Sequence, residues 1–406
     1  MALVFNDALL IDGTGREPRE HVSVLVQGSQ ITRVGSAGAI RAPEGARIID
    51  CGGLTLMPGL TDAHVHFGLT AAGANPPPES YVSYVLKVVE NIRIALEEGF
   101  TTVRDAGGLD PAYAAAVETG EIPGPRILPS GSFLSQTGGH GDQRPRFVDD
   151  APPAVPGLVA HTEICDGIDA VRRAARTQIR RGASQVKLMA SGGVMSPNDP
   201  LESLQFTVEE MAAAVHEARA YGKYVMAHCH TSGAMKNALE AGVRSLEHGS
   251  LLDEQTAQRI ARQEAFLVPT LVILEILARA EIPEASLAKL ELVRARSKDS
   301  VAVAQAAQVR IGSGSDLLGP RQSRRASELV EKARRMGAMG AMVSATKTNA
   351  ELFCLEDRIG TVGEGKDADL ILVRGNPIDD IGVLVDRANV AMVVKSGTVA
   401  KDLLEG

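Results

Sequence analysis

The sequence predicts an α/β fold: a (β/α)8 barrel of the TIM type with a small β-sandwich domain formed by both ends of the chain. The chain has 406 residues, more than the roughly 250 of such a barrel, and its 44% apolar residues can form a large core. In its middle, short apolar runs alternate with amphipathic stretches, which is typical of a parallel barrel. We therefore expect a first sandwich half over residues 1–56, the barrel over 57–362 and a second sandwich half over 363–406.

The two ends of the chain have similar strand patterns. Residues 22–26 and 30–34 form short alternating runs that are interrupted by Gly and Pro. Residues 369–373 and 390–395 have the same pattern near the other end. Such short, punctuated runs are typical of a small β-layer. We expect the two sets to complete one unit only when the ends of the chain meet.

The central region has the alternation that a parallel barrel requires. Residues 208–221 and 253–263 have amphipathic patterns and are predicted to be helices. Strand-like apolar runs at 185–189 and 225–230 lie on either side of the first of these helices. This order of strand, helix and strand predicts parallel strands with helices packed outside them.

Side chains that can bind metals or move protons follow several of these apolar runs. In a strand, residues two apart lie on the same face, so both histidines of the Asp62-Ala63-His64-Val65-His66 segment can reach one cation. A barrel gathers its chemistry at the carboxyl ends of its strands. We therefore expect one site there, formed by residues from five strand ends: His64 and His66, Lys187, His228, His248, and Asp316.

These motifs resemble those of the amidohydrolase superfamily. Within it they are most similar to the prolidase-like branch of binuclear metal-dependent enzymes, which includes Xaa-Pro dipeptidases and relatives of imidazolonepropionase. The resemblance runs from residues 11–15 through 58–60 to 365–370 and covers nearly the whole chain. It implies the fold described above and a hydrolase that cleaves Xaa-Pro or other carboxy-terminal amide bonds.

The resemblance also implies two divalent metal ions, for which imidazole and carboxylate ligands indicate zinc. By this resemblance, His64, His66 and Asp316 bind the more buried ion, and His228 and His248 bind the other. Lys187, carboxylated by carbon dioxide, would bridge the two. A hydroxide between the ions would attack the carbonyl, and Asp316 would carry its proton to the leaving amine. The alternatives are a surface lysine at Lys187 and a helix cap at Asp316.

Three further residues are candidates for contacts with substrate. By resemblance, His140 polarises the scissile carbonyl, and the alternative is a solvated loop residue. His230 stands where many members of the branch have tyrosine, so it could contact substrate, stabilise the core or bind metal. Arg144 follows His140 in the same loop and could bind a substrate carboxylate, unless it is an ordinary surface arginine. Glu247, beside His248, is expected to point away from the site.

The predicted function is binuclear zinc-dependent hydrolysis of a non-aryl amide bond, in a dipeptide or an N-acyl amino acid. One alternative is an aryl amide, carbamate or urea hydrolase, and a more remote one is a non-catalytic scaffold. Only 3% of the residues are aromatic and none is Trp, which favours the dipeptide over flat aryl substrates.

Composition limits the partners and the compartment. The net charge of −8, with no clustered basic segment, argues against nucleic acid and membrane partners. The four cysteines show no CxxC spacing, as expected of free thiols in a reducing compartment. The first residues lack a signal-peptide pattern, so a soluble cytoplasmic enzyme is expected. By resemblance, the enzyme is a homo-oligomer that acts on a small-molecule substrate.

Overall fold

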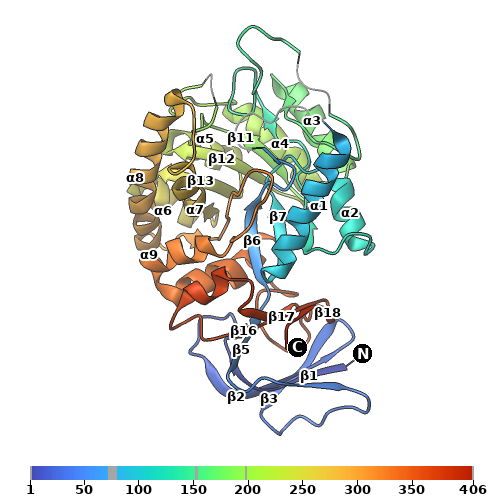
Figure 1. The fold of residues 1–406 in the computed structure, drawn as a ribbon. Coiled ribbons are helices and arrows are strands. Elements are labelled where there is room, and N and C mark those ends of the chain that lie inside the picture. The colour runs from blue at the N-terminus through green and yellow to red at the C-terminus, as the bar shows by residue number, and fades with distance from the viewer. Residues whose placement is uncertain (1, 72–79, 151–153, 197–198, 405–406) are drawn as a thin grey trace.

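The protein combines an upper part of strands and helices with a lower part of strands alone (Figure 1). The computed structural model describes residues 2–71, 80–150, 154–196 and 199–404. The chain passes from the lower part to the upper part where strand β5 (Leu54–Pro58) is followed by strand β6 (Leu60–Val65). None of the helices in these ranges combines the length and the apolar composition of a bilayer-spanning helix.

Both ends of the chain contribute to one sheet in the lower part. Its hydrogen-bonded order is β18-β17-β16-β5-β1-β2-β3, with β4 paired to β1. The predicted strands at both ends are therefore confirmed, whereas the arrangement as a sandwich stays a prediction. Besides β5, the members are β1 (Ala2–Leu10), β2 (Arg19–Gln27), β3 (Gln30–Ser36), β4 (Arg47–Asp50), β16 (Leu370–Arg374), β17 (Val390–Lys395) and β18 (Thr398–Asp402).

The strands of the upper part are parallel and form two ladders. One has the order β10-β9-β11-β12-β13-β14-β15 and the other the order β6-β7-β8. Nearly all of their residues are buried, as expected of parallel strands covered by helices. Besides β6, they are β7 (Phe100–Asp105), β8 (Arg126–Leu128), β9 (Leu134–Ser135), β10 (Glu163–Ile164), β11 (Val186–Met189), β12 (Val225–Thr231), β13 (Ser245–Leu251), β14 (Phe266–Val268) and β15 (Arg310–Ile311).

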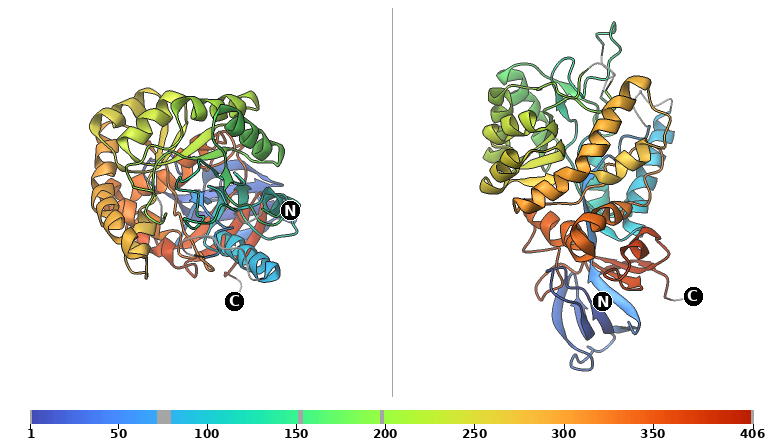
Figure 2. Two further views of the ribbon diagram at one scale, coloured as in Figure 1. Left: turned by 90° about the horizontal axis from the view of Figure 1, so that it is seen from above. Right: turned by 90° about the vertical axis from the view of Figure 1, so that its left-hand side faces the viewer.

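Backbone hydrogen bonds connect the two ladders. Ala63 N donates to Ser313 O at 2.7 Å and Asp316 N donates to His64 O at 2.8 Å, which joins β6 to the segment after β15. Ser184 N donates to Pro129 O at 2.7 Å on the other side. Seen from above, helices surround the strands (Figure 2). The predicted α/β class is confirmed, and a complete eight-stranded barrel stays a prediction.

Helices connect the parallel strands, and local capping explains where several of them begin. The predicted helix at 208–221 is α4, where Thr207 and Glu210 form a reciprocal capping box. The helix predicted at 253–263 is α6, capped by Asp253. The helices are α1 (Tyr81–Glu97), α2 (Pro111–Glu118), α3 (Ile168–Arg180), α4 (Val208–Ala220), α5 (Ser232–Ala241), α6 (Glu254–Arg262), α7 (Leu271–Leu277), α8 (Glu284–Ala306), α9 (Ser327–Val343, kinked at Gly337) and α10 (Asn349–Leu352).

An ion-pair cluster fastens the lower sheet to the upper strands. Arg126, at the start of β8, reaches Asp367 at 2.9 Å and Asp369 at 3.0 Å. Asp369 also accepts a hydrogen bond from Ser396 N at 2.7 Å. These two carboxylates belong to the motif at residues 365–370 on which the resemblance partly rests. Their position indicates a structural reason for that motif.

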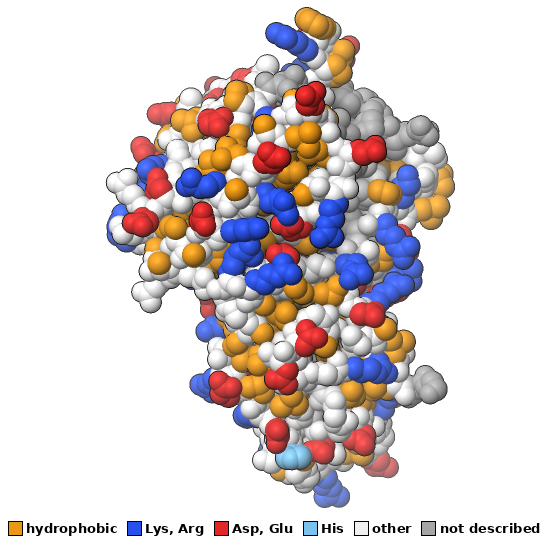
Figure 3. Space-filling view, turned by 60° about the vertical axis from the view of Figure 1, so that its left-hand side comes forward, with side chains coloured by type: hydrophobic (Ala, Val, Ile, Leu, Met, Phe, Trp, Pro, Cys, Tyr) orange, Lys and Arg blue, Asp and Glu red, His pale blue; other side chains and the backbone are white. Residues whose placement is uncertain are grey.

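The outer surface of the upper part carries mixed charge. On the face where α8 and α9 lie, Lys and Arg side chains gather across the middle with Asp and Glu side chains among them (Figure 3). Ion pairs of these helices include Arg294 of α8 with Glu275 of α7 at 2.6 Å, and Arg334 with Glu331 within α9 at 2.5 Å. The basic side chains of these pairs are therefore neutralised locally.

The close approach of the segment after β15 to β6 generates a prediction. A Cβ atom on Gly314 would lie 2.5 Å from the Cβ of His64 and 2.8 Å from Val268. We expect Gly314→Ala to lower the free energy of unfolding by about 1–3 kcal/mol, the usual effect of overpacking. Gly363→Ala is the control, because nothing lies within 4 Å of its added Cβ. Urea denaturation measures both, and equal stability of the two variants would contradict the prediction.

Candidate active site

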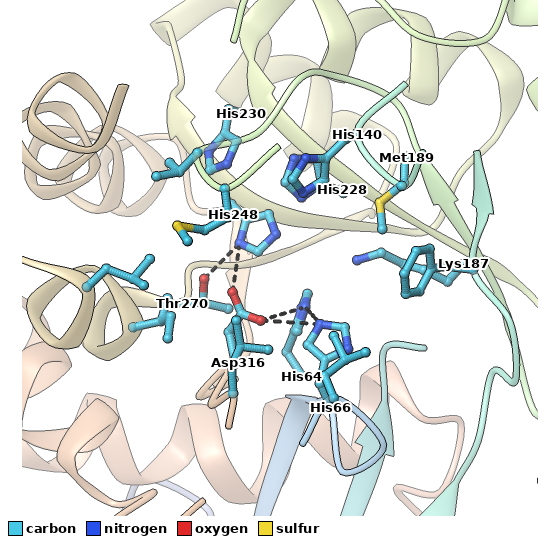
Figure 4. Close-up of a pocket in the computed structure, with 18 of the residues that line it drawn as sticks. His64, His66, His140, Lys187, Met189, His228, His230, His248, Thr270 and Asp316 are labelled. Atoms are coloured by element: carbon cyan, nitrogen blue, oxygen red, sulfur yellow. Dashed lines mark hydrogen bonds and ion pairs between the residues drawn. The ribbon is translucent and has the colours of Figure 1, made fainter. Parts of the chain in front are cut away.

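A cleft of about 130 Å³ lies at the carboxyl ends of the parallel strands. The predicted site residues converge there from separate strands and loops, with their side chains pointing toward one another (Figure 4). Arg144 does not line the cleft, whereas the other eight predicted residues do: His64, His66, His140, Lys187, His228, His230, His248 and Asp316.

His64, His66 and Asp316 have the spacing of a metal site. The Nε2 atoms of the two imidazoles are 3.2 Å apart. Asp316 Oδ1 lies 3.5 Å from His64 Nε2 and 3.3 Å from His66 Nε2. Three ligands about 2.0–2.1 Å from one tetrahedral zinc ion would be roughly 3.3 Å from each other. Each of the three can give one ligand atom to the same ion. The donor set therefore fits a divalent cation.

Hydrogen bonds on the far side of the rings fix which nitrogen faces the cleft. His64 Nδ1 donates to Glu247 Oε2 at 2.7 Å, and His66 Nδ1 donates to Gly107 O at 2.7 Å. His228 Nε2 donates to Gly192 O at 3.2 Å. In each ring the other nitrogen carries a lone pair. Such outer hydrogen bonds are a regular feature of metal-binding histidines.

Two of the candidate ligands have left-handed backbone conformations. His248 has a φ of 70° and Asp316 a φ of 55°. The His248 ring lies 4.5 Å from that of His228, centroid to centroid, and its Nδ1 is 2.7 Å from the Thr270 hydroxyl. Backbone strain of this kind is frequent at functional sites. Here it turns both side chains toward the cleft.

Glu247 faces the interior, so the expectation that it points away from the site is wrong. Besides accepting from His64, its carboxylate accepts from Arg104 Nη2 at 2.9 Å. The left-handed turn at His248 breaks the alternation of β13, so neighbouring residues both point inward. Sequence periodicity gives no signal for such a break.

Glu247 and Arg104 form a charge pair without solvent exposure. Burial alone would raise the pKa of Glu247, but Arg104 and the hydrogen bond from His64 outweigh it and lower the pKa to about 2. Arg104 Nε also donates to Ala63 O at 2.7 Å, beside His64 in the chain. Arg104 is a charged residue inside β7, whose six residues are all buried.

Asp62 holds together the two segments that carry the candidate metal ligands. Its Oδ1 accepts from His64 N and from Ser315 N, both at 3.0 Å, and its Oδ2 accepts from Ser315 Oγ at 2.5 Å. Ser315 immediately precedes Asp316. A single buried carboxylate therefore fixes the separation between the strand that carries the histidine pair and the loop that carries Asp316.

Lys187 is buried at the floor of the cleft. Within the described part of the chain, no hydrogen bond or ion pair involves its amine. Burial lowers the pKa of Lys187 to about 8. The surface position considered from the sequence is therefore wrong. A buried amine without a hydrogen-bond partner fits a lysine that is modified.

His140 reaches the cleft from its loop and stacks on His228 at 4.2 Å between ring centroids. Burial lowers the pKa of His140 to about 4, so the ring is neutral. Ser196 Oγ lies 2.8 Å from His140 Nδ1 and 3.1 Å from Gly193 O. The hydroxyl donates its one hydrogen to Gly193 O, so it accepts from His140 Nδ1, and Nε2 of His140 carries the lone pair. The solvated position considered for His140 is therefore wrong.

The structure places His230 in the cleft, but it does not place Arg144 there. His230 is buried, lies 3.0 Å from the Ser250 hydroxyl and stacks on His248 at 4.9 Å. It lines the cleft, so both a substrate contact and a structural role stay open. The structure does not bring Arg144 there, because Asp142, two residues away, accepts from its guanidinium at 2.7 Å and 2.6 Å.

Comparison with known proteins agrees with this geometry. Residues 55–400 match the model of the amidohydrolase family. The chain belongs to this family. The amidohydrolase is 32% identical to ochratoxinase of Aspergillus niger over 97% of this chain and 85% of that protein.

Solved structures place this amidohydrolase in the prolidase-like branch. A prolidase in complex with N-methylphosphonate-L-proline has a TM-score of 0.93 at 39% identity, covering 99% of this chain and 100% of that one. A Xaa-Pro dipeptidase with bound methionine has a TM-score of 0.89 at 32% identity, covering 98% and 99%. The predicted superfamily, branch and enzyme class are confirmed: the protein is a hydrolase that acts on carbon–nitrogen bonds.

The Glu247 network generates a prediction. Glu247→Gln leaves the buried Arg104 without its counter-charge and weakens the hydrogen bond that orients His64. We expect the free energy of unfolding to fall by about 3–5 kcal/mol and metal affinity by roughly 10–100-fold. Urea denaturation and metal titration measure the two effects. The control is Glu240→Gln, whose exposed side chain is 3.9 Å from Arg259. Unchanged metal affinity in Glu247→Gln would contradict the role of Glu247 in orienting His64.

Proposed function

We propose that this amidohydrolase cleaves the amide bond of a dipeptide or an N-acyl amino acid at a binuclear zinc centre. The observation that carries the proposal is the gathering of the four candidate histidine ligands, Lys187 and Asp316 in one cleft. The similarity to a prolidase and a Xaa-Pro dipeptidase supports the choice of substrate class.

The donor set assigns the ligands. His64, His66 and Asp316 would hold one ion, and His228 and His248 the other. Lys187, as a carbamate, would supply an anion to both, which accounts for a buried amine without a protein partner. Divalent ions in such a centre lower the pKa of a water molecule and polarise the substrate carbonyl.

Asp316 is proposed to transfer the proton. Burial opposes its charged form, but His64 and His66 hold the pKa of Asp316 below its ordinary value, so the carboxylate is ionised. It can accept a proton from the attacking water and then donate that proton to the leaving amine. One carboxylate would therefore act first as the base and then as the acid.

His140 is proposed to donate a hydrogen bond to the carbonyl oxygen as negative charge develops on it. A neutral ring can do so only if Nε2 carries the hydrogen, which requires the Ser196 hydroxyl to turn from Gly193 O and donate to Nδ1. Ser196 would therefore act as a positioning residue for His140.

The remaining residues of the cleft indicate which substrate groups it could bind. Its polar groups near the metal ligands include His230, Gln143 and Ser250, which could bind a substrate carboxylate. Most of the wall is apolar, which favours a substrate with an apolar side chain. The apolar lining residues are Leu69, Phe133, Met189, Val194, Met195, Ile273, Leu274, Leu277 and Leu318.

The same apolar wall favours one alternative, an aryl amide, carbamate or urea hydrolase. Such substrates carry no carboxylate, and among the described cleft residues Lys187 is the only lysine or arginine. A site that has no other strong cation could accept them. The two functions differ in whether a free substrate carboxylate is needed.

Several parts of the sequence-based interpretation stay predictions: the closed eight-stranded barrel, the β-sandwich and the domain boundaries at 56/57 and 362/363. The homo-oligomeric state and the identity of the metal as zinc also stay predictions.

The first test concerns Lys187. We expect Lys187→Ala to lose much of its bound metal and nearly all activity, because the bridging anion is gone. A short carboxylic acid added in solution should restore a small part of both. Metal analysis and a peptidase assay measure the effects. The surface variant Lys236→Ala is the control, since its partners among the described residues, Asp253 and Gln255, are exposed. Full metal content with ordinary activity in Lys187→Ala would rule out the bridge.

The second test concerns the substrate. If the enzyme is a dipeptidase, amidation of the substrate's carboxy-terminus should lower kcat/KM by about 100-fold or more, because buried donors then lose their acceptor. A panel of hydrophobic Xaa-Pro dipeptides, their amides and aryl carbamates measures this preference with the zinc-loaded enzyme. Equal rates on the acid and amide forms would favour the alternative.

A further inference from the structure

A second cavity, of about 620 Å³, lies at the amino-terminal ends of β12 to β15. Its lining includes Tyr224, Arg244 and Ala265, each of which directly precedes one of these strands, and Arg310, which begins β15. The active-site cleft is lined by His230 and Ser250, near the other ends of β12 and β13, and the two hollows share no lining residue among the described residues. The cavity is therefore separate from the active site, at the opposite end of the same strands.

The cavity is strongly cationic. Arg219, Lys223, Arg244 and Arg310 line it, whereas Glu264 is the only acidic residue among the described residues of its wall. This concentration contrasts with the net charge of −8 of the whole chain. A concave site lined by charges of one sign attracts counter-ions.

These cations are not neutralised within the protein. In the described ranges, none of the four forms an ion pair with a carboxylate. Several cations elsewhere do have such a partner, as Arg126 has in Asp367 at 2.9 Å. Arg310 donates to the backbone carbonyl of Glu264 and makes no ion pair with its carboxylate. What distinguishes the cavity is that four cations without a carboxylate partner among the described residues gather around one hollow.

Three of the guanidinium groups are held in place by neutral contacts. Arg219 donates to Gly242 O at 3.2 Å and Arg244 donates to Glu351 O at 2.9 Å. Arg310 and Arg244 lie 4.3 Å and 5.0 Å from the centre of the Phe266 ring. A guanidinium has five N–H donors, so each keeps donors for another acceptor. Holding them in advance reduces the entropy lost when a ligand binds.

We propose that this cavity binds a compact oxyanion with two or more negative charges, of the phosphate or dicarboxylate class. Such an anion accepts several charge-assisted hydrogen bonds at once and relieves the repulsion between the cations. A concave hollow of this size can admit a small molecule. The inference is independent of the reaction at the metal cluster.

Isothermal titration calorimetry of the metal-loaded enzyme with inorganic phosphate, and separately with succinate, tests the proposal. We expect saturable binding that weakens as sodium chloride is added. Lys223→Gln should weaken binding by about fivefold, the equivalent of an exposed ion pair worth about 1 kcal/mol. Arg219→Gln/Lys223→Gln should weaken it by more. Binding of phosphate alone identifies a phosphoryl ligand, and binding of both identifies a general oxyanion site.

The matched control is Lys298→Gln, which removes the same charge from an exposed position on α8 outside the cavity. Circular dichroism checks that all variants are folded. Absence of saturable binding of both anions to the unaltered enzyme would overturn the proposal. So would phosphate affinity that is unchanged in the double variant, because the anion would then be at the metal centre. A loss of affinity in Lys298→Gln equal to that in Lys223→Gln would also overturn the proposal, because it would show that net charge alone controls binding.

Discussion

The compensation of one buried charge, that of Glu247, determines how the site is arranged. A carboxylate without solvent is tolerated only when it is paired, and Arg104 and His64 provide the partners. These residues come from β13, β7 and β6, and β7 and β13 belong to different ladders. The network therefore holds strands together that share no backbone pairing. It also fixes the imidazole of His64 with Nε2 toward the cleft.

The sequence predicts the fold class and most of the cleft because both follow from periodicity. His64 near the end of β6 and His66 just after it both face the cleft, and α4 and α6 begin at recognisable capping residues. The placement of Glu247 could not be predicted, because it depends on the left-handed turn at His248. Arg144 could not be placed either, since a nearby carboxylate competes for the same guanidinium.

Rigidity in the site comes from neutral and charged hydrogen bonds together. Asp62 fixes the loop of Asp316 against β6, and backbone carbonyls orient the rings of His66 and His228. Preorganised groups need little rearrangement when charge develops on a substrate. The apolar wall of the cleft adds to this effect, since it lowers the local dielectric constant and strengthens each polar contact.

The lower sheet has a consequence for how the protein is made. Thr55 in β5 donates to Gly375 O at 2.8 Å, across 320 residues of chain. At translation rates of about 5–20 residues per second, roughly 16–64 seconds pass between the synthesis of β5 and that of β16. During that time its edge is unpaired and can associate with another nascent chain. Synthesis of the last strands therefore controls when the first ones are protected from aggregation.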